Sequence, residues 1–182
     1  MLRIDVYSSL DSESKFSAYN SIKDIFFLSS SIKSFTDEIK KEAFFKRWCG
    51  DYLDYYPEQF YLLYSDQKLM GYLSGCENSI QSLQILNVPG HETFSDLFSD
   101  FPAHLHINFH PDSRGKGFGS LLVKHYLDDL LKNSIYGVHL VTSEDAPNVS
   151  FYGRLGFKCT LKRTFKGSEL FFMGKHLSES GN

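Results

Sequence analysis

HLHINFHPDSRGKGFGS, residues 104–120, combines the pattern of a β-strand with that of a tight turn and a glycine-rich loop. Polar and apolar side chains alternate over its first six residues, which is the period-two pattern of a strand. Pro111 and Asp112 suit a sharp turn, and glycines at 115, 117 and 119 lack the Cβ that would keep a ligand from the backbone. Apolar residues at helical spacing follow from Leu121. The loop therefore should end at a helix N-terminus, where unpaired N–H groups and the helix dipole favour phosphate oxygens.

Two common phosphate-binding loops do not match this stretch. The loop of nucleotide hydrolases requires G-x-x-x-x-G-K-[ST], which is not found here. The dinucleotide fingerprint requires G-x-G-x-x-G, whereas the glycines here follow G-x-G-x-G and Ser120 occupies the next position. Nucleotide hydrolysis and dinucleotide binding are therefore not indicated.

Two motifs of the chain resemble those of the GNAT N-acetyltransferases. Arg114, Gly117 and Gly119 meet the pattern [QR]-x-x-G-x-[GA], with a predicted strand before it and a predicted helix after it. About thirty residues later, residues 148–157, NVSFYGRLGF, resemble the second signature of the family. The run AHLHINFHP, residues 103–111, is similar to members related to the acetyltransferase-like domain of O-GlcNAcase.

Composition limits the class of protein. The chain has 182 residues, 42% of them hydrophobic, which is enough for one good core, and we expect a single domain over 1–182. A net charge of −3 gives no electrostatic support for nucleic acid or an anionic membrane as a partner. Three separated cysteines predict neither a disulfide framework nor a structural zinc site. Because the sequence shows neither a signal peptide nor a long apolar run, we expect a cytoplasmic protein. We expect it to be either a monomer or a homodimer.

The order of predicted elements indicates a mixed α/β fold. Alternation and helical spacing predict a strand over 2–7, helices over 12–28 and from Thr36 as N-cap to about residue 52, and a hairpin over 60–74. Residues 76–103 are an irregular insertion, for which we expect either a lid over the acceptor site or a mobile segment. The central strand, loop and helix precede a buried strand over 137–142, a helix from Asp145 to Arg154 and a terminal strand pair, 157–161 and 169–177. This order matches the GNAT-like mixed, mostly antiparallel central sheet with helices on both faces.

The resemblance implies acetyl-CoA as co-substrate and assigns residues to it. Backbone N–H groups of the loop would hold the pyrophosphate, and the strand backbone at Ile107 and Phe109 would pair with pantetheine. Asp145 stands where the family often has Asn; it keeps an N-cap and acceptor role, while Asn148 could supply the amide donor. The predicted cofactor-binding residues are Ile107, Asn108, Phe109, Arg114, Gly115, Lys116, Gly117, Phe118, Gly119, Ser120, Asp145 and Asn148.

Tyr152 is the residue that the resemblance assigns to the leaving thiolate. With reference pKa values of about 10 for Tyr and about 8.5 for a thiol, full proton transfer is uphill by about 2 kcal/mol. We therefore expect a positioned hydrogen-bond donor whose help grows as the thiolate forms. Aromatic packing between helix and strand is the alternative role for the same side chain.

A general base is harder to assign. His104, His106 and Asn108 share one face of the predicted strand, and a histidine with a pKa near 6.5 suits neutral pH. Many family members have a carboxylate at the position of Ala103, so we expect His106, ahead of His104, to be the base, or else both to be a structural pair. His104, His106 and His110 have the side chains of a metal site but no accompanying carboxylate, and we predict no metal.

These observations favour an acetyl-CoA-dependent N-acetyltransferase in which an amine attacks the thioester directly. The amine acceptor is not identified by the sequence. A catalytically degenerate acyl-CoA-binding or sensor module is the alternative, because the base position is Ala103. Covalent catalysis is not indicated, since neither a G-x-S-x-G elbow nor a catalytic cysteine signature is found.

Overall fold

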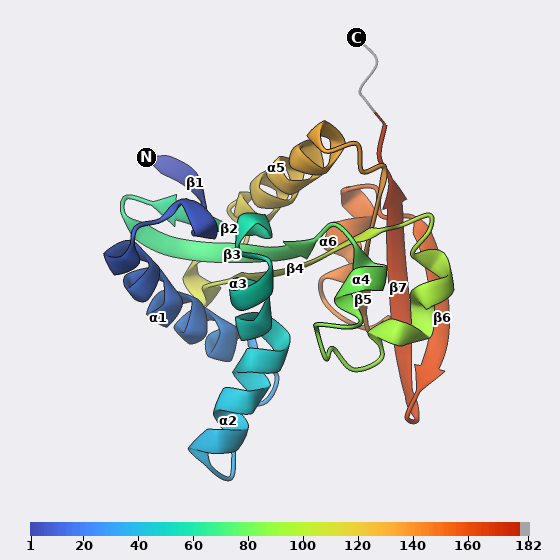
Figure 1. The fold of residues 1–182 in the computed structure, drawn as a ribbon, viewed down its shortest axis with the longest axis horizontal. Helices are drawn as coiled ribbons and strands as arrows, with labels where there is room; N and C mark the ends of the chain where they lie inside the picture. Colours follow the sequence, from blue (N-terminus) through green and yellow to red (C-terminus); the bar gives the residue numbers. More distant parts are fainter. Residues whose placement is uncertain (179–182) are drawn as a thin grey trace. The chain divides into compact units, whose positions relative to one another are not determined.

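The structure, a computed structural model, describes residues 1–178 (Figure 1). It divides into two compact units. Unit 1 comprises residues 1–75 and 106–126, and unit 2 comprises residues 76–105 and the chain from 127 onward. The central strand β4 (Ala103–Phe109) and the helix α5 (Phe118–Lys132) each contribute residues to both units. Seven strands are hydrogen-bonded neighbours in the order β1-β2-β3-β4-β5-β7-β6, and one neighbour pair, β4 with β5, is parallel, which confirms the mixed and mostly antiparallel α/β class.

Unit 1 begins with an antiparallel set of strands: β1 (Leu2–Val6), β2 (Phe60–Ser65) and β3 (Lys68–Cys76). The predicted hairpin is confirmed. Its turn is made by Asp66 and Gln67 with φ of 48° and 71°, and two positive φ values suit the right-handed twist of the flanking strands.

The helices of unit 1 begin at acidic caps. Asp11 caps α1 (Ser12–Ser29), and Asp37 caps α2 (Glu38–Phe45) by accepting from the Lys40 N–H at 2.8 Å. The prediction of Thr36 as cap was wrong by one residue, because the side chain of Asp37 makes the capping bond. The predicted continuous second helix is α2, a π-helical turn η2 (Lys46–Gly50) and α3 (Asp51–Tyr55). The remaining short turns here are η1 (Tyr7–Ser9) and η3 (Pro57–Gln59).

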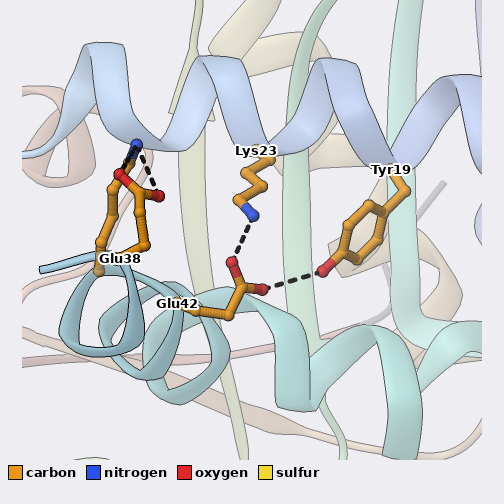
Figure 2. A network of polar contacts seen from close by, with 5 residues as sticks. Tyr19, Lys23, Glu38 and Glu42 are labelled. Carbon is orange, nitrogen blue, oxygen red and sulfur yellow. Dashed lines mark hydrogen bonds and ion pairs between the residues drawn. The ribbon is translucent and has the colours of Figure 1, made fainter.

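Polar side chains join α1 to α2. Figure 2 shows Tyr19 and Lys23 projecting from α1 toward the carboxylate of Glu42 on α2. Lys23 forms an ion pair with Glu42, and the Tyr19 hydroxyl donates to the same carboxylate at 3.4 Å. The rings of Phe26 on α1 and Phe45 on α2 also pack edge to face at 5.3 Å, so the helix pair is held by both apolar and polar contacts.

Helices cover both faces of the unit 1 strands. On β2, the Tyr61 ring contacts Tyr126 of α5 at 5.7 Å, while the adjacent Phe60 faces the other way and stacks on Tyr72 at 5.2 Å. The Tyr72 hydroxyl bonds to Cys49 of the π-helical turn. Since neighbouring residues of a strand point to opposite faces, α5 lies on one face and the α1–α3 group on the other.

Unit 2 is built on β5 (Gly137–Thr142), which pairs in parallel with β4 and antiparallel with β7 (Ser168–His176). The predicted buried strand is therefore confirmed, with a parallel neighbour on one side. β6 (Cys159–Phe165) completes the predicted terminal pair but begins two residues later than expected. The helix α6 (Val149–Arg154) is shorter than the predicted 145–154 and begins after Asn148 at the N-cap, so the N-cap role expected of Asp145 was wrong.

The segment 76–103 folds around aromatic side chains of its own. It contains the short helices α4 (Ser79–Ser82) and η4 (His91–Leu97). Phe94, Phe98 and Phe101 form a buried cluster with Phe172 of β7. The segment is thus anchored to the strands of unit 2, and a lid function for it stays a prediction. Within residues 1–178 no helix combines the length and apolar character needed to cross a bilayer.

Candidate functional site

The glycine-rich loop of unit 1 presents an open backbone surface. Gly115 and Gly117 have φ of +74° and +80°, a conformation that L side chains rarely adopt, and a Cβ built at either position meets no atom within 4 Å. The α5 helix begins at Phe118, so Gly119 and Ser120 belong to its first turn, a small correction to a helix expected after Gly119. First-turn N–H groups lack intrahelical partners, so an anion can approach them along the helix axis.

The base of the loop is tied to neighbouring elements of unit 1. The Ser113 hydroxyl, in the short turn η5 (Pro111–Ser113), lies 2.9 Å from the Met70 carbonyl oxygen, which also accepts from the His110 N–H. The Arg114 guanidinium donates to the Ser29 hydroxyl at 3.3 Å, at the end of α1. These contacts fix where the loop leaves β4 and leave the two positive-φ glycines at its tip.

The second half of β4 is packed closely on β3. A Cβ at Gly71 would come within 2.3 Å of the Phe109 ring, so glycine is required for this approach. The Phe109 carbonyl oxygen accepts from the Ser29 hydroxyl at 3.2 Å. The register pairs of β4 with β5 are Ala103 with Val138 and His104 with His139, and the backbone of Ile107 lies past the second pair.

A pocket of about 330 Å³ opens in unit 1 beside β4. Aromatic rings from α1, α2 and the π-helical turn form one part of it, and polar side chains of β4 form another. Its lining residues are Phe26, Ser30, Ser31, Ile32, Phe44, Trp48, His106 and Asn108. None of these eight is acidic, so the pocket favours a ligand with an apolar group and an uncharged polar atom.

His106 is the candidate base that lines this pocket. Burial lowers the pKa of His106 from 6.5 to about 4, so its imidazole is neutral at physiological pH. The expectation of a pKa near 6.5 was therefore wrong, because desolvation disfavours the charged ring. The ring contacts Tyr52 edge to face at 5.8 Å, which fixes its orientation on the α3 side.

Asn108, the other polar group from β4, belongs to a buried hydrogen-bonded chain. Its amide donates to the Tyr72 hydroxyl at 2.9 Å, and Tyr72 bonds to Cys49. Burial raises the pKa of Cys49 to about 12 and that of Tyr72 well above its usual value, so both stay protonated. The chain positions Asn108 without introducing charge.

His104 lies in different surroundings from His106. Its side chain is in unit 2, is 2% exposed, and its Nδ1 lies 2.8 Å from the Ser79 hydroxyl. A ring so deeply buried offers no surface to an acceptor. The expected row of His104, His106 and Asn108 is therefore divided, and the last two line the pocket.

Tyr152 and its neighbours are described within unit 2. Tyr152 is 3% exposed on α6, and its ring packs edge to face on Phe157 at 5.5 Å. Burial raises the pKa of Tyr152 well above its usual value, so its hydroxyl keeps its proton. Asn148 accepts from the Thr142 hydroxyl at 3.3 Å, which links α6 to the end of β5.

Sequence reasoning missed the aromatic part of the pocket. Phe44 and Trp48 are four residues apart, and such helical spacing is the usual mark of a core-facing stripe. The Phe44 and Trp48 rings do contact each other, at 6.4 Å, yet both also line the pocket. Ser30 and Ser31, just after the predicted helix over 12–28, also line the pocket. The pocket depends on the end of α1 approaching β4, for which the sequence carries no local signal.

Comparisons with known proteins agree with this architecture. The sequence model of the acetyltransferase (GNAT) family matches residues 19–157. The structure described as SsHAT is similar at a TM-score of 0.72 and 20% identity, covering 98% of this chain and 99% of that chain. The ribosomal-protein-S18-alanine N-acetyltransferase from Escherichia coli is similar at a TM-score of 0.56 and 18% identity, covering 100% of this chain and 97% of that chain. A phosphinothricin acetyltransferase from Sinorhizobium meliloti, in complex with AcCoA, is similar at a TM-score of 0.57 and 16% identity, covering 97% of this chain and 88% of that chain. No curated protein sequence matches.

Proposed function

Since the chain belongs to the acetyltransferase (GNAT) family and is an acetyl-CoA-dependent acetyltransferase, we propose that it transfers the acetyl group to the amine of an acceptor bound in the unit 1 pocket. The amine nitrogen attacks the thioester carbonyl, the new C–N bond forms and the C–S bond breaks. The amine proton leaves to water, and the departing thiolate takes up a proton to give the free thiol of CoA.

The loop is the feature on which the proposal rests most. Two positive-φ glycines, separated by Lys116 and with open space in front of them, precede the first turn of α5, which is the geometry of a phosphate cradle. We assign the pyrophosphate to the N–H groups of residues 115–120 and the pantetheine amides to the strand backbone at Ile107 and Phe109. Arg114 is held at its base by Ser29, which leaves Lys116 as a cation near the loop tip.

The pocket favours an acceptor amine that is neutral when it reacts. An alkyl amine with a pKa of about 10.4 needs about 4 to 5 kcal/mol to lose its proton at pH 7. His106, with a pKa of about 4, is too weak a base to remove that proton, but its neutral ring can accept a hydrogen bond from the amine. The aromatic lining desolvates the bound group and lowers the amine pKa. We therefore propose an acceptor that carries its amine on an apolar or aromatic group.

Tyr152 is the proposed donor to the leaving thiolate. Its raised pKa means that it donates a hydrogen bond rather than giving up its proton. A donor that is preorganised by packing stabilises charge as it develops, without reorganisation during the reaction.

A catalytically degenerate acyl-CoA-binding module is the second candidate, favoured by the low basicity of His106 and by Ala103 at the usual carboxylate position. The relation to the acetyltransferase-like domain of O-GlcNAcase, the single domain, the cytoplasmic location and the absence of nucleic acid or membrane as partners stay predictions from the sequence.

A panel of amines tests the proposal. Wild-type protein and acetyl-CoA are incubated with aliphatic, aromatic and amino-sugar amines and with peptides, and release of the CoA thiol is followed with a thiol reagent. We expect turnover with at least one apolar or aromatic amine, and a strong decrease for Trp48→Ala, which removes part of the pocket wall. Binding of acetyl-CoA without thiol release for any amine would favour the binding module.

A further inference from the structure

We propose that His91, His104 and His139 form a binding site for a divalent transition-metal ion of the zinc class. Each of the three side chains offers one ring nitrogen, and these nitrogens lie within 4.8 Å of one another. All three residues are buried, at 6%, 2% and 0% exposure. The three are residues of unit 2, and the inference does not depend on the proposed acetyl transfer.

The strands and the turn before η4 bring the three histidines together. His104 and His139 are register partners on the parallel strands β4 and β5, so their side chains lie next to each other on one face. His91 is the first residue of η4 and follows Gly90, whose φ of +83° suits glycine. The His91 ring lies 4.5 Å from the His104 ring and 5.2 Å from the His139 ring.

Hydrogen bonds set the tautomer of His139. Its Nδ1 lies 2.8 Å from the Phe101 carbonyl oxygen, which can only accept, so Nδ1 carries the proton. The Nε2 atom of the neutral ring then has a lone pair. This arrangement, with one ring nitrogen bonded to a backbone carbonyl and a lone pair on the other, is typical of metal-ligating histidines.

Hydrogen bonds also set the tautomer of His104. The Ser79 hydroxyl has one proton and donates it to the Pro102 carbonyl oxygen at 2.7 Å. It therefore accepts from the Nδ1–H of His104, which lies 2.8 Å away. Nε2 of His104 is thus a second lone-pair nitrogen in the cluster. Two of the three histidines have the protonation that a metal requires before any ion arrives.

One pair of these nitrogens already lies at a distance suitable for a chelate, whereas the separations of up to 4.8 Å in the cluster must shorten when an ion binds. Nε2 of His91 is 2.9 Å from Nε2 of His139, and since the latter has a lone pair, His91 holds the proton between them. Two nitrogens bound to zinc at about 2.0 Å are about 3 Å apart when their angle lies between 90° and the tetrahedral value. An entering ion therefore replaces this proton, and the neutral His91 ring takes a proton on its Nδ1 instead.

Aromatic rings pack against the histidine cluster and bury it. The His139 ring is stacked between Phe98 and Phe172, with centroids at 4.8 and 5.0 Å and interplanar angles of 15° and 20°. The His91 ring also packs on Phe98 at 4.8 Å. Three neutral imidazoles and one open position are a known zinc ligand set, in which water or hydroxide completes the tetrahedron. An ion here would join η4 to β4 and β5.

The test is metal binding by protein without a histidine tag that has been treated with a chelator. Co²⁺ is added while its visible absorption is followed, and Zn²⁺ is then used to displace it. We expect one equivalent of Co²⁺ to give the spectrum of nitrogen coordination, Zn²⁺ to displace it, and Zn²⁺ to raise the unfolding temperature by about 5 °C at a large excess over Kd.

Variants identify the ligands. His91→Gln and His104→Gln, checked for folding by circular dichroism, should each weaken binding at least tenfold, and Ser79→Ala should weaken it less. His176→Gln is the matched control, because this histidine is exposed at the end of β7. The proposal is overturned if wild-type protein binds no equivalent of either ion, or if binding is as tight in His91→Gln and His104→Gln as in the control.

Discussion

Replacing Gly117 by alanine separates the function of the loop from its contribution to stability. At φ of +80° an L residue costs about 1–2 kcal/mol, and the lower entropy of the unfolded alanine chain offsets part of this. The new Cβ meets no protein atom within 4 Å, so the folded protein has no further penalty. A net loss of about 1 kcal/mol should lower the unfolding temperature by about 2–4 °C. On the proposed assignment of the loop, the same Cβ would occupy space that the pyrophosphate needs.

Gly167→Ala is the matched control for this experiment. Gly167 lies in the turn between β6 and β7 with φ of +82°, and a Cβ there also meets nothing within 4 Å. Both variants should lose about the same stability in thermal unfolding. In calorimetry, acetyl-CoA affinity should fall at least tenfold, about 1.4 kcal/mol, in Gly117→Ala and stay unchanged in Gly167→Ala. Equal acetyl-CoA affinity in the two variants would refute the assignment of the loop as the cradle.

Three further predictions follow from the two units. Tyr152→Phe should fold and bind acetyl-CoA but lose about a hundredfold in kcat, as expected for one preorganised donor; full turnover in the variant would contradict the donor role. His106 has a folded pKa of about 4 and an unfolded pKa of about 6.5, so the folded state binds fewer protons and stability is lost as pH falls from 6.5 to 4. Urea unfolding of His106→Gln should therefore show about 2 to 3 kcal/mol less acid destabilisation over that range than wild type, and equal losses would mean that the pKa is not lowered. Gly71→Ala should destabilise unit 1 by about 1–3 kcal/mol, because its Cβ would come 2.3 Å from the Phe109 ring, and an unchanged denaturation midpoint would show that this approach is looser.

Local patterns were sufficient for most of the fold. The hairpin of β2 and β3, the buried strand β5 and the start of α1 follow from alternation, apolar runs and caps, and the structure confirms them. The errors lie at element ends, where two signals compete. Thr36 and Asp37 are adjacent capping residues, and only the folded backbone shows that Asp37 accepts from Lys40. Asp145 before Pro147 resembles a helix start, but α6 begins at Val149.

Long-range proximity limited the prediction of the sites. The loop motif is contiguous, so the sequence identified its glycines, while the positive φ of Gly115 and Gly117 is a finding of the structure. The pocket joins Trp48 to His106, which are distant in sequence, so spacing could not reveal it. The histidine cluster likewise joins His91 and His139 to His104, whereas sequence proximity had grouped His104 with His106 and His110. The lowered pKa of His106 could not be predicted either, since it depends on burial.

A crystal structure with acetyl-CoA bound tests the central claim most directly. We expect pyrophosphate oxygens within hydrogen-bond distance of backbone N–H groups in residues 115–120, and pantetheine amides paired with the backbone at Ile107 or Phe109. Pyrophosphate bound elsewhere on the protein, with the loop of Gly115 and Gly117 unoccupied, would contradict it.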